Sequence, residues 1–219
     1  MIDSALQILA PHHCYSCGKT GFLLCSRCKY DIIEAFQNDC VVCFRPSCRG
    51  VCARHQLPYQ KAWVVGRREG ILEGLIDAYK FENVKTGAKV LAGLLHETLP
   101  QFPDDTVVVP IATISAHIRE RGYDHMLLIA KEFARLRGLH CQPLLTRRTN
   151  THQRGESALQ REQNAKEAFM ARGSVADIPY LILDDVMTTG ATLKYAAHTL
   201  KQAGAQTVYV AALARQPLD

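Results

Sequence analysis

The sequence lacks any apolar run long enough to cross a membrane, and its start lacks the features of an export signal. No segment approaches the roughly 18 consecutive apolar residues of a spanning helix. The first residues, MIDSALQILAPHH, contain neither a basic stretch nor an apolar run of signal-peptide length. We therefore predict a cytoplasmic protein without membrane insertion, in which cysteines are reduced and bind metal more readily than they form disulfides.

The sequence is also poor in aromatic residues and has little excess charge. Aromatic residues make up 7% of the chain and are not interleaved with basic residues in the pattern that stacks single-stranded bases. The formal net charge is +5. Two zinc ions held by four thiolates each would add about −4 and leave about +1. Charge is therefore a weak argument for nucleic acid, and the apolar content of 47% indicates a globular chain.

Cysteine, in contrast, is abundant near the N-terminus, where all cysteines except Cys141 form closely spaced pairs. Two thiolates separated by two residues wrap one metal ion, and two such pairs complete a tetrahedral site. Too few large apolar residues lie between them to form a core without metal. We predict a double zinc-ribbon-like module over residues 1–58 with two structural Zn²⁺ ions. The predicted ligands are Cys14, Cys17, Cys25, Cys28, Cys40, Cys43, Cys48 and Cys52.

The sequence leaves open which cysteine pairs share a metal ion. Sequential pairing gives spacers of 7 and 4 residues between pairs, and interleaved pairing gives 22 and 19. Gly18 and Gly21 would let the first loop turn back tightly, which favours sequential pairing. His12, His13 and His55 are close enough in sequence to serve as ligands. Because eight cysteines suffice for two sites, we expect these histidines to be solvated.

From Lys61 onwards the sequence alternates between strand-like and helix-like segments. The strand-like segments are continuous runs of Val, Ile and Leu, which is typical of a parallel sheet with helices on both faces. We predict an α/β domain over residues 59–219, preceded by a short helix at 2–9. The predicted strands are 62–65, 106–110, 141–145, 180–183 and 207–213, and the predicted helices are 71–79, 86–99, 124–137, 157–169 and 193–203.

The strongest chemical pattern is YLILDDVMTTGATLKYAAHTL at residues 180–200. A short buried strand is followed by two carboxylates, Asp184 and Asp185, and then by a small-residue turn that leads into a helix. A helix N-terminus favours a phosphate group, and carboxylates accept hydrogen bonds from ribose hydroxyls or hold Mg²⁺. The stretch therefore predicts a sugar-phosphate site. The turn consists of Thr188, Thr189, Gly190, Ala191 and Thr192.

The segment LILDDVMTTGATL resembles the motif with which type I phosphoribosyltransferases bind phosphoribosyl pyrophosphate (PRPP). From Cys14 to Arg215 the chain further resembles the ComF family, which is associated with competence and DNA uptake. In that family a cysteine-rich zinc module precedes a phosphoribosyltransferase-like domain. Two other segments support the resemblance: IRERGYDH at 118–125, and the spaced residues Gln153, Ser157, Arg161, Asn164 and Phe169.

This resemblance implies PRPP binding with Mg²⁺ and transfer of the phosphoribosyl group to an acceptor. Asp184 and Asp185 would hold the ribose hydroxyls, and residues 188–192 would hold the 5′-phosphate. Three cations are candidates for neutralising the pyrophosphate: Lys80, Arg119 and Arg121.

The chain departs from the family pattern after Tyr123. The family commonly has Asn-Gln there, whereas this chain has Asp124 and His125, which places an acid near an expected anion site. We expect this departure to affect the acceptor site or the rate more than PRPP binding.

Two hypotheses of function are consistent with the sequence. The first is a phosphoribosyltransferase linked to natural competence, DNA uptake or DNA processing. The second is a non-catalytic adaptor or sensor that binds PRPP or a nucleotide. In the second hypothesis the zinc module docks single-stranded DNA or a competence helicase.

Overall fold

The computed structural model describes residues 13–33, 39–81, 86–147 and 168–216 of the chain. Its main sheet has five strands in the order β1-β7-β6-β2-β3, and every pairing in this sheet is parallel. A separate antiparallel pair joins β4 to β5. The strands are β1 (Lys61–Arg67), β2 (Val107–Pro110), β3 (His140–Cys141), β4 (Leu145–Arg147), β5 (Phe169–Ala171), β6 (Pro179–Met187) and β7 (Thr207–Arg215).

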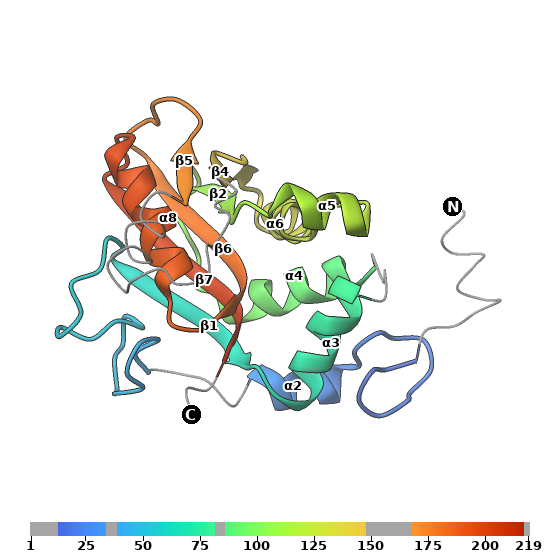
Figure 1. Ribbon diagram of the computed structural model, residues 1–219. Coiled ribbons are helices and arrows are strands. Elements are labelled where there is room, and N and C mark those ends of the chain that lie inside the picture. Colours follow the sequence, from blue (N-terminus) through green and yellow to red (C-terminus); the bar gives the residue numbers. More distant parts are fainter. Residues whose placement is uncertain (1–12, 34–38, 82–85, 148–167, 217–219) are drawn as a thin grey trace, which may run out of the picture.

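Helices cover both faces of the main sheet (Figure 1), which confirms the predicted α/β class. The helices α3, α4 and α6 pack on one face, and α8 packs on the other. A fully buried Leu, Ile or Phe side chain contributes about 1.5–3 kcal/mol, so these two cores dominate the stability of the fold. The helices are α2 (Ser26–Ile33), α3 (Gly70–Phe81), α4 (Gly87–Thr98), α5 (Ser115–Arg121), α6 (His125–Arg137) and α8 (Ala191–Gln202).

The two halves of the cysteine-rich segment pack on opposite faces of the sheet. Residues 13–33 join the core of α3, α4 and α6, to which they contribute Leu24 and Ile32. Residues 39–60 join the core beneath α8 through Val41 and Tyr59. Figure 1 shows these blue and light-blue segments on different sides of the molecule. Each half thus shares a core with the sheet, and the domain boundary at residue 58 stays a prediction.

Several elements differ from those predicted. The single strand expected at 141–145 is divided into β3 and β4, because Pro143 between them has no N–H group to donate to a sheet. The short helix α5 was not predicted. The predicted helix at 2–9 lies outside the described residues, as does the helix at 157–169 apart from its last two residues, of which Phe169 begins β5.

Within the described part of the chain, no helix has the length and apolar character needed to cross a membrane.

Candidate functional site: an acid pair and a glycine turn at the sheet edge

The two acids lie inside β6, near its carboxyl end, rather than after it as predicted. Asp184 is 7% exposed and Asp185 is 8% exposed. Successive side chains of a strand point to opposite faces, so the two carboxylates leave the sheet in different directions. The Asp185 N–H group donates to Oδ1 of Asp184 at 2.9 Å, which fixes the first carboxylate against its own backbone.

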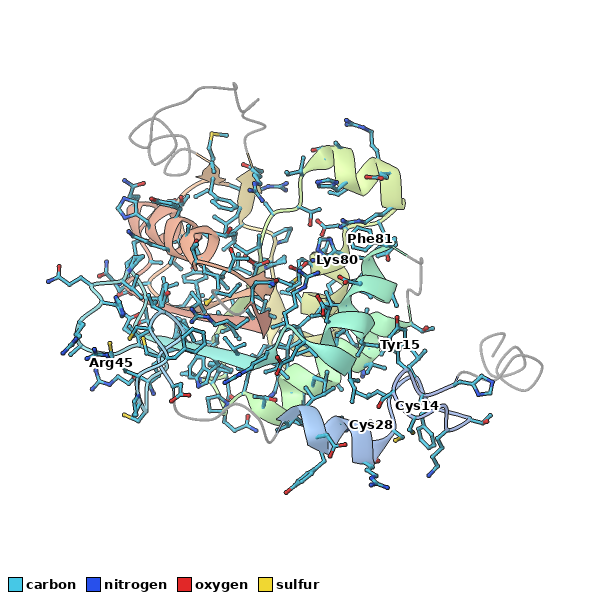
Figure 2. All side chains as sticks on the ribbon, turned by 60° about the horizontal axis from the view of Figure 1, so that its bottom comes forward. Cys14, Tyr15, Cys28, Arg45, Lys80 and Phe81 are labelled. Carbon is cyan, nitrogen blue, oxygen red and sulfur yellow. The ribbon has the colours of Figure 1, made fainter. Side chains whose placement is uncertain are left out.

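Two groups from the helical layer converge on one oxygen of Asp185. Lys80 Nζ, in the last turn of α3, lies 2.8 Å from Oδ2, and His125 Nε2, at the start of α6, lies 2.6 Å from the same atom. The hydroxyl of Tyr79 donates to the His125 carbonyl at 2.9 Å and thereby ties α3 to α6. Figure 2 shows Lys80 and Phe81 at the end of α3.

The surroundings of His125 determine which ring nitrogen carries the proton. Arg121 Nη1 lies 3.2 Å from Nδ1 of His125. A guanidinium group only donates hydrogen bonds, so Nδ1 must accept. The proton of a neutral imidazole is then on Nε2, which donates to Asp185. His125 thus connects the Arg121 guanidinium to the acid pair.

Asp124, the acid that replaces the usual Asn of the family, is occupied as the N-cap of α6. Its Oδ1 accepts the Leu127 N–H at 3.1 Å and the Thr113 hydroxyl at 2.9 Å. An aspartate at an N-cap interacts favourably with the helix dipole. The side chain therefore stabilises the helix that carries His125, and its charge is partly neutralised by these donors.

The two carboxyl groups differ in proton affinity. Burial and the neighbouring Asp185 charge raise the pKa of Asp184 to about 7, although Lys80 and Arg147 oppose the shift. Burial also raises the pKa of Asp185, but the hydrogen bond from His125 and the charge of Lys80 outweigh it and hold this pKa below the ordinary carboxyl value. At neutral pH Asp185 is ionised and Asp184 is close to its titration point. A cation that binds here would favour ionised Asp184.

The turn after β6 leads from the strand that carries the acids into the first residues of α8. Gly190 is the N-cap of α8 with a φ of 77°, a left-handed conformation that favours glycine. Thr189 Oγ1 accepts the Ala191 N–H at 3.4 Å, and Thr188 and Thr189 are exposed. The first N–H groups of a helix have no partner within it, so the start of α8, with Ala191 and Thr192, can bind an anion.

The structure brings two of the three predicted cations towards the acids. Lys80 contacts Asp185 directly, and Arg121 reaches it through His125. Arg119 is exposed on α5, and within the described part of the chain no hydrogen bond or ion pair joins it to the acid pair. His125 was not predicted as a member of the site. The departure from the family pattern at this position was the one sequence feature that could have indicated it.

The first four cysteines form one compact cluster. The Sγ atoms of Cys14, Cys17, Cys25 and Cys28 all lie within 4.8 Å of one another. Tetrahedral Zn²⁺ with Zn–S bonds of about 2.3 Å requires S···S distances of about 3.8 Å, and Cys17 and Cys25 are 3.7 Å apart. The four side chains therefore fit a structural zinc ion.

The second cluster contains a histidine where a cysteine was predicted. It consists of Cys40, Cys43, Cys52 and His55, and the Cys43 and Cys52 sulfurs are 3.6 Å apart. Nε2 of His55 is buried and has no hydrogen-bond partner among the described residues, as expected for a metal ligand. Cys48 is exposed and lies outside the cluster. The assignment of Cys48 as a ligand, and of His55 as solvated, is corrected accordingly.

The spacing within the clusters explains this correction. Cys52 and His55 are separated by two residues, as are Cys25 and Cys28 in the first cluster, so His55 occupies the position of Cys28. The first and second cysteine pairs share one cluster, and the third pair joins Cys52 in the other, as sequential pairing predicted. All nine cysteines lie in the described part of the chain, and none forms a disulfide there.

The two clusters repeat one backbone conformation. In each, the residue after the second cysteine donates its N–H to the carbonyl of the first, at 2.9 Å: Gly18 to Cys14, and Phe44 to Cys40. Both donors have a positive φ, 72° for Gly18 and 57° for Phe44. Phe44 is the only non-glycine residue with a positive φ in the described part of the chain.

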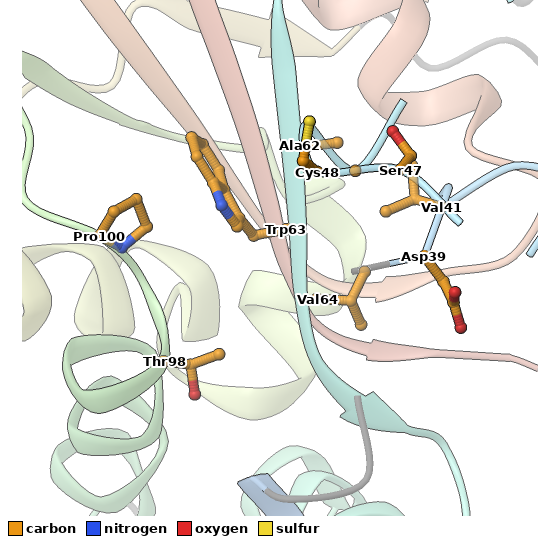
Figure 3. A pocket seen from close by; sticks show the side chains of 10 residues that line it. Asp39, Val41, Ser47, Cys48, Ala62, Trp63, Val64, Thr98 and Pro100 are labelled. Carbon is orange, nitrogen blue, oxygen red and sulfur yellow. The ribbon is translucent and has the colours of Figure 1, made fainter. Parts of the chain in front are cut away.

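A cavity of about 280 Å³ lies beside β1 (Figure 3). It is bounded on one side by Asp39, Val41 and Cys48, and on the other by Trp63 and Pro100. Neither acid and no residue of the turn lines it. The cavity is therefore separate from the candidate site.

Comparison with known proteins places the acids and the turn in a known domain. The family pattern described as "Phosphoribosyl transferase domain" matches residues 127–219, from α6 to the end of the chain. Among solved structures, glutamine PRPP amidotransferase from B. subtilis is 22% identical with a TM-score of 0.43, and the match covers 59% of this chain and 26% of that one. A TM-score this low does not indicate a shared function.

Three relatives match most of the chain. Competence protein F of Haemophilus influenzae is 30% identical over 181 residues, which are 76% of this chain and 77% of the relative. DNA utilization protein YhgH of Escherichia coli (strain K12) is 30% identical over 88% of this chain and 96% of the relative. Competence protein ComFC of Streptococcus pneumoniae is 24% identical over 88% of this chain and 87% of the relative. The chain therefore belongs to the ComF family of competence-associated proteins with a phosphoribosyltransferase fold.

Proposed function

We propose that this protein binds PRPP with Mg²⁺ and transfers its phosphoribosyl group in natural competence, DNA uptake or DNA processing. The observation that carries the proposal is the placement of two buried carboxylates in β6 directly before the glycine turn that begins α8. Carboxylates suit ribose hydroxyls, and the helix N-terminus suits the 5′-phosphate. The names of the relatives, a competence protein and a DNA utilization protein, support this link.

In this proposal each group at the sheet edge has a separate task. Asp184 and Asp185 accept hydrogen bonds from the ribose hydroxyls, and Mg²⁺ supplies further positive charge for the diphosphate when it is bound. Lys80 neutralises Asp185 in the absence of ligand, at 2.8 Å, and lies within reach of the pyrophosphate when PRPP enters. His125 donates to Asp185 at 2.6 Å and would keep this carboxylate ionised and oriented when Lys80 binds the pyrophosphate.

The transfer breaks the bond between ribose C1 and the pyrophosphate oxygen, which leaves with the electron pair. A nucleophilic atom of the acceptor then forms the new bond to C1 and releases a proton. Positive charge develops on the ribose during the step, and the two carboxylates at its hydroxyls stabilise that charge. Catalysis of this kind depends on positioning and electrostatics.

The experiment that tests this proposal is calorimetric titration with PRPP in the presence of Mg²⁺, compared with ribose 5-phosphate and with pyrophosphate alone. We expect PRPP to bind more tightly than either fragment, because only PRPP spans the acids and the turn. Equal affinity for pyrophosphate and PRPP would contradict a sugar-phosphate site. Pyrophosphate release after mixing PRPP with a panel of nucleobases then distinguishes an enzyme from a sensor.

A second candidate function, docking of single-stranded DNA, is supported by the surface of the first cysteine-rich half. Phe22 is 48% exposed and Tyr15 is 46% exposed, and the Lys19 ammonium lies 5.8 Å from the Phe22 ring centroid. An exposed ring beside a cation suits base stacking and phosphate contact. We expect binding to an oligothymidine to weaken in Phe22→Ala and to fall with salt. Salt-independent binding would argue against phosphate contacts.

A further inference from the structure

The last residue of β7, Arg215, is buried in an unusual way for a charged side chain. It is 1% exposed, and its Nη2 donates to the Val42 carbonyl at 3.1 Å. Its Cζ lies 4.0 Å from the centroid of the Phe44 ring. Nε and Nη1 have no hydrogen-bond partner among the described residues. Burying a guanidinium with two unsatisfied nitrogens is unfavourable unless a nearby negative charge compensates.

The compensating charge is available in the second cysteine cluster. Val42 and Phe44 flank Cys43, one of its four members. A Zn²⁺ ion held by three thiolates and one neutral imidazole has a net charge of about −1. The metal-bound cluster therefore supplies the negative charge that the buried Arg215 guanidinium needs.

The backbone conformation of Phe44 is a second observation that supports a role for the contact between Phe44 and Arg215. Its φ of 57° is strained for a phenylalanine, and the equivalent residue of the first cluster is Gly18, which adopts this conformation without strain. Glycine at position 44 would remove the strain and also the ring that covers Arg215. Strained residues of this kind persist where surrounding contacts hold them.

The other end of the connection is the turn beside the acid pair. In the sheet, Arg215 is the register partner of Met187, the residue directly before Thr188. The Gln216 N–H donates to the Met187 carbonyl at 2.9 Å. The Met187 side chain packs beneath Gly190, with its sulfur 3.8 Å from the position of a Cβ atom there. Contacts therefore run without a break from the second cluster to the glycine turn.

We propose that Arg215 is a positioning residue that couples the metal-bound second cluster to the turn 188–192. With the cluster loaded, the guanidinium stacks on Phe44, and the ends of β7 and β6 keep their alignment. Without this contact the ends of the two strands loosen, and the turn loses the conformation that presents its N–H groups. The choice of PRPP as a probe rests on the proposed function, whereas the order of the turn does not.

The test compares two substitutions that break the same contact from opposite sides. Arg215→Lys keeps the charge but loses the planar stack, and Phe44→Gly removes the ring while it retains the turn conformation of the cluster. Arg67→Lys is the matched control, because Arg67 ends the neighbouring strand β1 in register with Arg215 and is exposed. Each variant is assayed for zinc content, for PRPP affinity by calorimetry, and for hydrogen exchange of the Lys194 and Gln216 amides, which donate to the Gly190 and Met187 carbonyls.

We expect Arg215→Lys and Phe44→Gly to retain the wild-type zinc content and to exchange the Lys194 and Gln216 amides faster than wild type. Their PRPP affinity should fall roughly tenfold at unchanged stoichiometry, and Arg67→Lys should match wild type in every assay. A merely structural role would instead lower the melting temperature, speed exchange throughout the sheet and not at the turn alone, and leave the PRPP affinity of the folded fraction unchanged.

Unchanged exchange of these amides in Phe44→Gly would overturn the inference, even if Arg215→Lys failed to fold. If wild-type protein did not bind PRPP, the proposed function would fail, and the exchange measurement would still decide the role of Arg215.

Discussion

Individual side chains at the acid pair have distinct and separable effects. His125 and Lys80 meet at one oxygen of Asp185, and Arg121 fixes the tautomer of His125 from the other side. Asp184 has no comparable cation within hydrogen-bond distance among the described contacts, which is why burial dominates its proton affinity. The two acids can therefore be tested with different measurements.

Substitution of His125 tests whether it orients Asp185. Glutamine can donate an amide N–H to Oδ2 as the imidazole does, so His125→Gln should bind PRPP within about threefold of wild type. Leucine cannot donate, so His125→Leu should bind roughly tenfold more weakly. The measurement is calorimetric titration with PRPP and Mg²⁺. Equal affinities of the leucine and glutamine variants would show that the hydrogen bond is unimportant.

The raised pKa of Asp184 predicts that wild type and Asp184→Asn differ in their free energy of unfolding by an amount that depends on pH. Because its pKa of about 7 in the folded state lies above the value of about 4 of an unfolded carboxyl, the cost of ionising Asp184 is absent below about pH 4, develops between about pH 4 and 7, and is fully present above 7. Without Mg²⁺, Asp184→Asn should therefore be more stable than wild type at pH 8, by roughly 2–4 kcal/mol. At pH 4 the two proteins should differ by less than about 1 kcal/mol. Urea unfolding at both values measures this, and a destabilised variant at pH 8 would contradict it.

At the scale of elements, the cysteine clusters show how a short repeat determines a metal site. In both clusters, two cysteines with two residues between them are followed by a second pair of ligands with the same spacing. His55 is the last ligand of the second cluster. Backbone N–H groups also point at the sulfurs, from Cys25 to Cys14 and from Cys52 to Cys40, each at 3.4 Å. These contacts stabilise thiolates.

Metal analysis of single variants tests the ligand set. His55→Ala should lose one zinc ion per chain, because three thiolates leave an open coordination position. Cys48→Ser should keep the full zinc content, because Cys48 is exposed and outside the cluster. The reverse pattern, with zinc lost in Cys48→Ser and retained in His55→Ala, would restore the eight-cysteine assignment.

The elements that the sequence predicted well are those with a single strong pattern. The apolar run at 180–183 and the residues of the glycine turn predicted β6, the turn and the start of α8, although β6 extends through the acids to Met187. The helix α5 was not predicted because it has seven residues and none of them is buried, so no apolar period marks it. The contact of His125 with Asp185 joins residues 60 apart in the chain, and spacing alone cannot predict it.

At the scale of the whole molecule, the cysteine clusters support both faces of the sheet. Cys14, Cys25 and Cys28 belong to the core with α3, α4 and α6, while Val41 belongs to the core with α8. The composition of residues 1–58 predicted a metal-dependent module. It could not predict this division, because the faces on which the halves pack are decided by contacts far apart in sequence.

Removal of zinc should therefore destabilise the sheet as well as the cysteine-rich segment. Treatment of the intact protein with a zinc chelator should lower the melting temperature, followed through the sheet by circular dichroism, by about 10 °C or more. Addition of zinc should restore it. A sheet transition that does not change on chelation would indicate that the cysteine-rich segment folds separately.

The measurement that tests the central claim most directly is calorimetric titration of PRPP with Mg²⁺ into wild-type protein and into Asp184→Asn/Asp185→Asn. Both substitutions keep the shape of the side chains and remove the charges that would hold the ribose. The melting temperature of the variant is the control for folding. The account predicts saturable, Mg²⁺-dependent binding to wild type and loss of that binding in the folded variant. Unchanged affinity in the variant would contradict the assignment of the acid pair as the PRPP site.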